Sequence, residues 1–565
     1  MRYRIGSKLP RKIGRAIPVV LLLTIIPISL RAETIAGLGT ATFPTSTHSQ
    51  TAQHEFMRGL LLLHLFEYGD AAKAFVAAEK TDPGFAMAYW GETMTFNHPV
   101  WNQLNAAAGR AALAKFAPTP EARAKRIADP RERAYMSAVE ILYSGKGTKH
   151  GRDAEYARAM EKLSRANPKD DEAQLFYALA RLGKSEGVRD VPTYLKAAAI
   201  AKAVFLRNPH HPGAAHYWIH GMDDPQHAAG ALEAARALSS IAPDAAHAQH
   251  MCSHIFVALG LWDDLVKANL AATSVVNRHA AAAGRPPVRC GHYNAWLAYG
   301  YLEQGRLADA KKVVAACHAQ ATQAGMAAQA RGTVDPDESR IGSFVQMRTH
   351  YMVVTQRWNG GVAGFNAEMS GALMPAFNYT FAGGFAAAEE GRLPEARKAL
   401  AKIDEILPQL PALLDNIGYP AGDPARSVPE IERMELEAAI LAAEGHSEKA
   451  IAMMEQAAAK ENALSFAFGP PSPEKPSNEF LGELLLRANK PRQAQTAFEA
   501  ALKRAPRRTD SLLGLARAES AMGDKAAAAK VFGELLKIWK HAEPGFAPKE
   551  EAKRGAYGAE RTAGE

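Results

Sequence analysis

Several hallmarks of enzymes and of β proteins are missing from this chain of 565 residues. It contains no convincing run of alternating β-branched residues, which excludes an extensive sheet. It also has no Gly-x-Ser-x-Gly motif, no phosphate-binding loop, no Gly-x-Gly-x-x-Gly after a strand and no Cys-x-x-Cys-His. Those absences leave no identifiable nucleophile, nucleotide site or covalent haem site. Whether the chain is an enzyme therefore stays open, and a binding role is favoured.

Cysteine is scarce as well. Cys252, Cys290 and Cys317 are the three in the chain, and so small and odd a number cannot form a disulfide framework. One bridge with one free thiol, or three free thiols, both fit the sequence. Cys252 lies among histidines, so a role as an extra metal ligand is also kept open.

The first 32 residues contain no acid but seven Lys and Arg. Without those seven, 60 basic residues stand against 59 acidic ones, so the rest of the chain has no overall basic field for nucleic acid.

The basic stretch precedes the apolar run 16–30 and then Arg31-Ala32, which is the order of a secretory signal. This run is short for a membrane span of about 20 residues, so an anchor is the weaker alternative. We expect cleavage after about Ala32 and a periplasmic or secreted protein with no membrane span.

The remaining chain is expected to be helix after helix, rich in alanine and leucine, because its length exceeds one ordinary globular core. Residues 1–32 are the predicted signal peptide and 33–50 a linker. Residues 51–210 are N-terminal helical repeats, 211–330 histidine-rich repeats, 331–545 C-terminal repeats, and 546–565 a flexible tail.

A repeat is visible in the spacing of small and aromatic residues. The first copy has Gly59, Ala71, Phe75, Ala78 and Pro83, and a distant copy has Gly482, Ala494, Phe498, Ala501 and Pro506 at the same spacing. The small residues allow two antiparallel helices to approach, the Phe fills the space between repeats, and Pro stops the second helix. This is the helix–turn–helix pattern of the tetratricopeptide repeat (TPR). It predicts an all-α, right-handed superhelical solenoid.

Histidines recur with the same period. The pair His216 and His220 is followed 34 residues later by the pair His250 and His254, and 34 residues is the TPR period. His247 precedes His250 by three residues. Because residues three and four apart share one helix face, these five side chains are expected to line one face of two neighbouring repeats. His292 takes the equivalent of the His247 position in the next copy.

The repeat positions of these histidines correspond to those that TPRs turn toward their concave groove. Two imidazoles one helical turn apart can bind one ion, and a pair on the next helix would complete the ligand set. The predicted metal site consists of His216, His220, His247, His250 and His254, with zinc, copper or iron as the ion. Asp223 is either a further ligand or a partner that orients an imidazole. The alternatives are histidines that only hydrogen-bond across the groove, or protonated histidines that bind an acidic peptide or organic anion.

Segments such as HYWIH (216–220) and HAQHMCSHIF (247–256) resemble a family of exported bacterial TPR proteins of uncharacterised function, and the similarity covers most of residues 51–545. Its most specific motif is HYxIH…HAxHMxSHIF. The resemblance implies the helical solenoid but no reaction. Proline is usual in that family at the position of Cys252, so the resemblance does not support cysteine ligation.

These observations predict an exported scaffold whose concave groove binds a protein or peptide partner and holds a transition metal or small ligand at the histidines. Two alternatives remain. One is a metal-dependent enzyme, hydrolytic or oxidative, built on the same solenoid. The other is a pure protein-interaction scaffold whose histidines contact a peptide.

Overall fold

The computed structural model describes Met1 and residues 32–185, 188–323, 339–369, 371–466 and 468–562. The predicted signal peptide therefore lies almost entirely outside the described residues, and so does the predicted boundary between residues 330 and 331. Within the described part of the chain, no helix combines the length and the hydrophobicity needed to cross a membrane.

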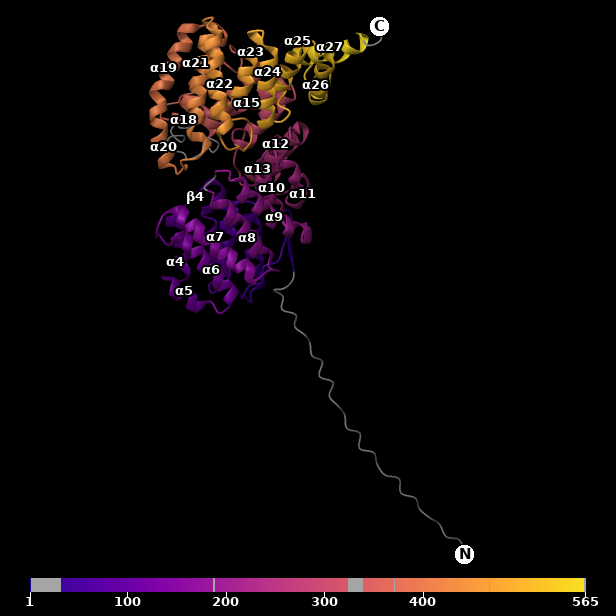
Figure 1. Ribbon diagram of the computed structural model, residues 1–565. Helices are drawn as coiled ribbons and strands as arrows, with labels where there is room; N and C mark the ends of the chain where they lie inside the picture. The colour runs from indigo at the N-terminus through magenta and orange to yellow at the C-terminus, as the bar shows by residue number, and fades with distance from the viewer. Residues whose placement is uncertain (2–31, 186–187, 324–338, 370, 467, 563–565) are drawn as a thin grey trace.

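The chain is an array of helical hairpins, and its lower part in Figure 1 is N-terminal. Its helices are α1 (Gln50–His64), α2 (Tyr68–Thr81), α3 (Ala86–Met94), α4 (Ala106–Phe116), α5 (Pro120–Arg126), α6 (Pro130–Tyr143), α7 (Lys149–Ala166), α8 (Asp171–Gly183) and α9 (Val191–Arg207). A short turn, with β3 (Asn97–His98), η2 (Pro99–Trp101) and β4 (Gln103–Leu104), follows α3.

The middle of the array joins the two parts. It comprises α10 (Pro212–Met222), η3 (Ala228–Ala231), α11 (Leu232–Ile241), α12 (Ala246–Ala258), α13 (Trp262–Ala282), α14 (His292–Glu303) and α15 (Leu307–Ala321). Figure 1 shows α10 to α13 between the indigo-to-purple part and the orange-to-yellow part.

The upper part contains the remaining repeats. Its helices are α17 (Arg340–Thr355), α18 (Leu373–Glu389), α19 (Leu393–Ile406), α20 (Leu410–Asn416), α21 (Val428–Ala443), α22 (Ser447–Ala463), α23 (Ser477–Arg487), α24 (Pro491–Arg504), α25 (Thr509–Ala521), α26 (Lys525–Ile538) and α27 (Ala547–Thr562). The 3-10 turns η5 (Leu407–Gln409), η6 (Pro424–Arg426) and η7 (Trp539–His541) connect some of them. The predicted all-α fold of TPR-like repeats is confirmed.

The repeat spacing has the mechanical cause that the sequence suggests. A Cβ atom on Gly59 would lie 2.8 Å from the Phe75 ring, and one on Gly91, in the next repeat, would lie 2.3 Å from it. The Phe498 ring sits in the same way against Gly482 and Gly514, at 2.7 and 2.2 Å. Each phenylalanine thus fills the gap that two glycines leave in consecutive repeats, which sets how closely the repeats stack.

Two segments differ from their predictions. Residues 33–50, predicted as a linker, begin with the antiparallel hairpin of β1 (Glu33–Ile35) and β2 (Gly39–Ala41). It packs on the repeats, because Thr40 donates its backbone N–H to the His210 carbonyl at 3.0 Å and Phe43 is 1% exposed. The predicted flexible tail, 546–565, is instead mostly the helix α27, which packs on α26 and buries Ala552 completely. Gly555 allows this close approach, because a Cβ atom there would lie 2.2 Å from the Phe532 ring of α26.

Buried hydrogen bonds and ion pairs join the middle repeats to repeats that are far from them in the sequence. Arg508, which is fully buried, donates to Glu303 of α14 at 3.2 Å and to Glu479 of α23 at 2.8 Å. On the N-terminal side, His64 of α1 hydrogen-bonds Tyr217 of α10 at 2.9 Å. Because both parts of the chain hold the middle repeats, α10, α12 and α14 are fixed relative to one another.

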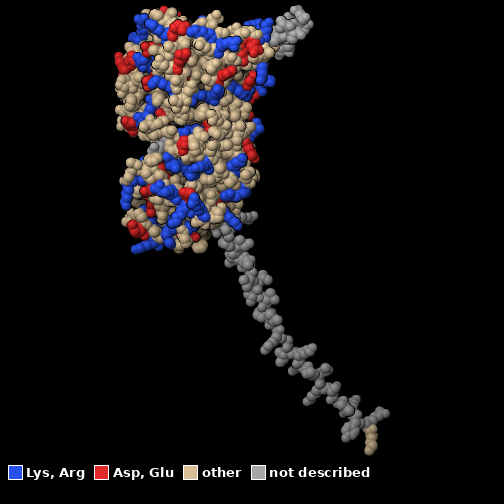
Figure 2. All heavy atoms as spheres, viewed as in Figure 1, with Lys and Arg blue, Asp and Glu red and all other residues tan. Residues whose placement is uncertain are grey.

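The surface has no field of one sign on the face seen in Figure 2, where Lys and Arg are interspersed with Asp and Glu. This distribution agrees with the near balance of basic and acidic residues after position 32. The same view shows an indentation between the lower and upper parts.

Candidate metal centre

Six imidazoles from three consecutive repeats converge in the middle of the array. The five predicted histidines are joined by a sixth from α14; the set is His216 and His220 on α10, His247, His250 and His254 on α12, and His292 on α14. They fall into two groups of three whose ligand nitrogens lie within 4.8 Å of one another. We call these the His250 cluster, with His254 and His292, and the His216 cluster, with His220 and His247. The sequence predicted one site, whereas the structure divides its residues between two.

In the His250 cluster, three Nε2 atoms point at one another. The Nε2 of His250 lies 3.2 Å from that of His254 and 3.0 Å from that of His292. The indole of Trp296 covers the group, with ring centroids 4.7 Å from His250 and 4.6 Å from His254. The cluster is therefore compact, and one wall of it is aromatic.

The other nitrogens of His250 and His254 are held by hydrogen bonds. Nδ1 of His254 donates to the Asp223 carboxylate at 2.6 Å. Nδ1 of His250 donates to the Asn269 side-chain oxygen at 2.8 Å, and the Asn269 amide is oriented by its own bond to the Leu265 carbonyl at 3.0 Å. In the neutral form of each ring, the proton on Nδ1 leaves a lone pair on Nε2. Asp223 thus orients an imidazole, which was one of its two predicted roles.

The His216 cluster is arranged similarly. Nδ1 of His216 donates to the backbone carbonyl of His64 at 2.6 Å, which leaves a lone pair on its Nε2. The Nε2 of His220 lies 3.1 Å from it. Nε2 of His247 is buried and has no hydrogen-bond partner among the described residues.

Protonation of four of the six rings is disfavoured. Burial, together with the neighbouring imidazoles of His254 and His64, lowers the pKa of His216 to about 3. Burial also holds the pKa values of His220, His247 and His250 well below the usual range of histidine. These imidazoles are therefore neutral at pH 7, which is the form that binds metals. The alternative in which protonated histidines grip an anion is correspondingly disfavoured.

A cavity of about 420 Å³ borders both clusters. Five of the six histidines line it, together with Met251 and the aromatic rings of Trp101, Tyr293, Trp296, Tyr419 and Phe468. The turn after α3 and the loop 418–423 form its opposite wall. No Lys or Arg is among the described lining residues.

A third group lies outside this cavity. Nε2 of His64 and Nε2 of His211 bond to the two oxygens of Glu172 at 2.6 and 2.9 Å, and all three side chains are fully buried. The carboxylate already occupies both Nε2 atoms, so these hydrogen bonds fit structural roles for the two histidines.

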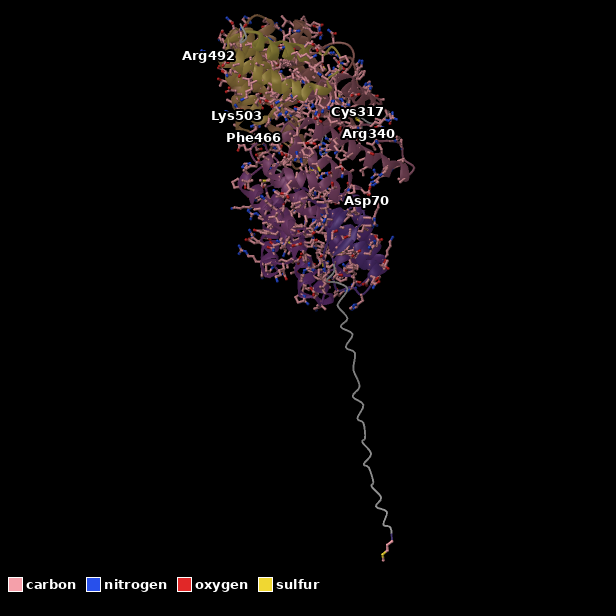
Figure 3. All side chains as sticks on the ribbon, turned by 90° about the vertical axis from the view of Figure 1, so that its right-hand side faces the viewer. Asp70, Cys317, Arg340, Phe466, Arg492 and Lys503 are labelled. Carbon is pink, nitrogen blue, oxygen red and sulfur yellow. A yellow bond between two sulfur atoms is a disulfide. The ribbon has the colours of Figure 1, made fainter. Side chains whose placement is uncertain are left out.

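The cysteines divide into one bridge and one thiol. Cys290 and Cys317 form a disulfide, which Figure 3 places, through Cys317 and Arg340, between the part that carries Asp70 and the part that carries Arg492. Cys252 is free and buried, and its thiol donates to the Ala248 carbonyl at 3.3 Å. Burial raises the pKa of that thiol to about 12. Cys252 belongs to none of the ligand groups found among the described residues.

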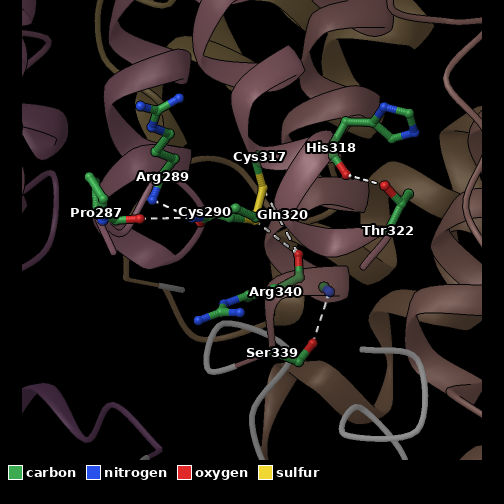
Figure 4. The surroundings of a disulfide bond; sticks show 10 residues. Pro287, Arg289, Cys290, Cys317, His318, Gln320, Thr322, Ser339 and Arg340 are labelled. Carbon is green, nitrogen blue, oxygen red and sulfur yellow. Dashed lines mark hydrogen bonds between the residues drawn. A yellow bond between two sulfur atoms is a disulfide. The ribbon is translucent and has the colours of Figure 1, made fainter. Parts of the chain in front are cut away.

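The disulfide anchors the segment that leads to His292. Figure 4 shows Gln320 of α15 donating to the Pro287 carbonyl at 2.7 Å and accepting from the Arg289 backbone N–H at 2.8 Å. Cys290 follows in the same segment, two residues before His292. These three links fix the start of α14 and, with it, the third histidine of the His250 cluster.

No protein-family model and no curated protein sequence matches the chain. Among solved structures, it is similar to a chain of the APC/C hetero-tetramer Cut9–Hcn1 at 12% identity, covering 90% of this chain and 78% of that one, with a TM-score of 0.32. Yeast Tom70 has 13% identity, 91% and 96% coverage and a TM-score of 0.28. The P58(IPK) TPR domain has 13% identity, with 84% of this chain and 98% of that chain covered and a TM-score of 0.21. The chain's own repeats define its architecture.

Proposed function

We propose that this chain is a binding protein, a TPR-like scaffold that holds a transition-metal ion at the His250 cluster. The observation that carries the proposal is the approach of two lone pairs. His250 and His254 each have Nδ1 committed to a hydrogen bond, yet their Nε2 atoms lie 3.2 Å apart. In the neutral form of the two rings these Nε2 atoms present facing lone pairs, which repel unless a cation lies between them.

The spacing of the nitrogens supports a metal ion as that cation. Zinc–imidazole bonds are about 2.0–2.1 Å long, so two ligands of a tetrahedral ion are roughly 3.3 Å apart. The distances of 3.0 and 3.2 Å within the His250 cluster are close to this value. Neutral imidazole is a borderline ligand that suits zinc, copper or iron. Asp223 and Asn269 would hold the two rings in place, as outer partners do at metal sites.

Export to the periplasm or the medium is part of the proposal. It rests on the basic and apolar order of the first 32 residues. The disulfide between Cys290 and Cys317 supports it, because such bonds persist in oxidising compartments.

The groove is proposed to bind a protein or peptide partner beside the metal. Trp101, which is 38% exposed, is the aromatic side chain at the cavity that such a partner would contact.

A metal-dependent enzyme, hydrolytic or oxidative, is the second candidate function. The observation in its favour is the size of the cavity, about 420 Å³, which is in the range of small-molecule sites. Three histidine ligands leave a fourth metal position for water or substrate.

Elemental analysis tests the proposal. The full chain is produced with export to the periplasm and purified without a histidine tag, beside a His250→Ala/His254→Ala double variant. We expect a transition metal in the wild type and its loss from the His250 cluster in the variant. Circular dichroism establishes that the variant is folded. The metal proposal fails if both proteins are metal-free and bind added zinc or copper only weakly, and a pure protein-interaction scaffold is then the remaining interpretation.

A further inference from the structure

The His216 cluster has the features of a metal site in its own right. Its three ligand nitrogens lie within 4.8 Å of one another, and His216 and His220 approach to 3.1 Å between their Nε2 atoms. The third member, His247, has a buried Nε2 with no hydrogen-bond partner among the described residues. An unpaired buried polar atom destabilises the fold, because it has lost its hydrogen bonds to water. Such a cost is normally offset by a partner, and the neighbouring nitrogens identify a cation as the partner that fits.

The orientation of His216 is fixed from outside the cluster. Its Nδ1 donates to the His64 backbone carbonyl at 2.6 Å. A carbonyl oxygen can only accept, so the proton lies on Nδ1 and the lone pair of Nε2 points at His220 and His247. A backbone carbonyl on the outer nitrogen is a usual partner of a metal-binding histidine.

A strained residue forms the floor of this cluster. Phe66 follows α1 with φ of +58°, a left-handed conformation that is uncommon for bulky side chains. Its ring centroid lies 4.4 Å from His216 and 5.6 Å from both His220 and His247. Backbone strain of this kind is energetically unfavourable and is concentrated at functional sites. Here it places one apolar ring against all three imidazoles.

The two clusters are neighbours at the same cavity. The ring centroids of His220 and His254 are 6.3 Å apart, and those of His247 and His250 are also 6.3 Å apart. His220 and His247 line the cavity together with all three members of the His250 cluster. A ligand in this cavity would therefore have access to ions bound at both clusters.

We propose that His216, His220 and His247 bind a second transition-metal ion, so that the chain holds a centre of two ions, each with three histidine ligands. This inference rests on the proposed function, since the first ion is the one assigned to the His250 cluster. The donor set, imidazole nitrogen without carboxylate, selects borderline divalent ions such as Zn²⁺ and Cu²⁺ over Mg²⁺ or Ca²⁺.

The test counts ions in matched variants of the full chain. Protein is stripped with a chelator, loaded with excess Zn²⁺ or Cu²⁺, desalted and analysed for metal per chain. His247→Ala removes a ligand from the His216 cluster, and His292→Ala removes one from the His250 cluster. His279→Ala, an exposed histidine at the end of α13, is the control. We expect about two ions in the wild type and the control, and about one in either ligand variant.

Electron paramagnetic resonance of the Cu²⁺ forms gives a second readout. Two adjacent Cu²⁺ ions broaden each other's spectra, so the wild type should show spin coupling that disappears in each ligand variant, leaving an isolated signal with nitrogen hyperfine structure. Circular dichroism of the stripped proteins excludes unfolding as the cause of metal loss.

The outcomes separate this inference from the function on which it rests. One ion per wild-type chain, retained in His247→Ala and lost in His292→Ala, overturns the second site but leaves the first. One ion lost in both variants means that a single ion is shared by the two clusters, which also overturns it. If no variant and no wild-type sample holds metal, the proposed function fails as well.

Discussion

The carboxylate of Asp223 accepts a hydrogen bond from Nδ1 of His254 at 2.6 Å, although the two residues belong to different repeats. Asp223 directly follows α10, whereas His254 lies on α12. The bond is buried, and it directs Nε2 of His254 toward His250. The helix α10 therefore supplies two histidines of the His216 cluster, and the residue that follows it orients a ligand of the neighbouring His250 cluster.

Replacing that carboxylate should weaken metal binding. In Asp223→Asn the side-chain oxygen can still accept from His254, but the negative charge that makes the imidazole a better donor is lost. Removal of such outer partners lowers metal affinity by about 10–100-fold. A competition titration against a chelating dye at pH 7 measures the change.

Glu233→Gln is the matched control, because it removes an exposed carboxylate on α11 in the same region. Its metal affinity should equal that of the wild type. If Asp223→Asn also binds metal with unchanged affinity, Asp223 has only a packing role.

Loss of the disulfide should affect both stability and the His250 cluster. Cys290 and Cys317 are 27 residues apart, and closing a loop of this size stabilises a protein by about 3–4 kcal/mol in the chain-entropy account. Because Cys290 is two residues from His292, the double variant Cys290→Ser/Cys317→Ser should also lose about tenfold in metal affinity.

Urea unfolding and the dye competition together test this prediction. Cys252→Ser, at the free cysteine, is the control, since a hydroxyl can keep the bond to the Ala248 carbonyl. Unchanged affinity in the double variant would mean that the hydrogen bonds of Gln320 suffice to hold the start of α14.

The stacking of repeats should be sensitive to one methyl group. In Gly514→Ala the new Cβ would lie 2.2 Å from the Phe498 ring, and such overpacking costs about 1–3 kcal/mol. Gly533→Ala lies within α26, and its Cβ would meet nothing within 4 Å. It should gain up to about 1 kcal/mol of helix propensity. Thermal unfolding distinguishes the two variants. Equal changes in melting temperature would contradict the packing of the Phe498 ring between the two glycines of consecutive repeats.

A buried glutamate should make stability fall at high pH. Burial raises the pKa of Glu435 well above its usual range, and Glu435 is fully buried with one oxygen bonded to Ser477 at 2.6 Å. The folded state then binds a proton that the unfolded state releases above about pH 4.5. Its contribution to stability therefore decreases as pH rises from that value toward the folded pKa.

Glu435→Gln removes this titration while keeping an oxygen that can accept from Ser477. The variant should be more stable than the wild type at pH 8 by at least about 1 kcal/mol, with a smaller difference at pH 5. Urea unfolding at several pH values measures it. Glu455→Gln, an exposed site on α22, should leave the pH profile unchanged. If the free energy of unfolding depends on pH in the same way in the wild type and in Glu435→Gln, Glu435 is ionised in the folded protein.

Much of the fold was predictable because it repeats locally. The distance of 16 residues from Gly59 to Phe75, and again from Gly482 to Phe498, identifies a helical hairpin without any knowledge of its neighbours. The hairpin at 33–41 and the helix α27 were not predictable in this way. Their order comes from docking on other elements, as in the bond from Thr40 to His210, and docking leaves no periodic signal in the segment itself.

The sequence by itself determined which histidines share a helix face, because spacings of three, four and 34 residues fix the angular position of a side chain within a repeat. It did not determine which imidazoles meet. His292 joins His250 across 42 residues, and Asp223 reaches His254 rather than its own neighbour His220. The division into two clusters and the pairing of Cys290 with Cys317 also needed the tertiary structure. The physical reason is that a repeat fixes directions along one helix, whereas the distances between helices depend on the packing of the repeats and on the turns that join them.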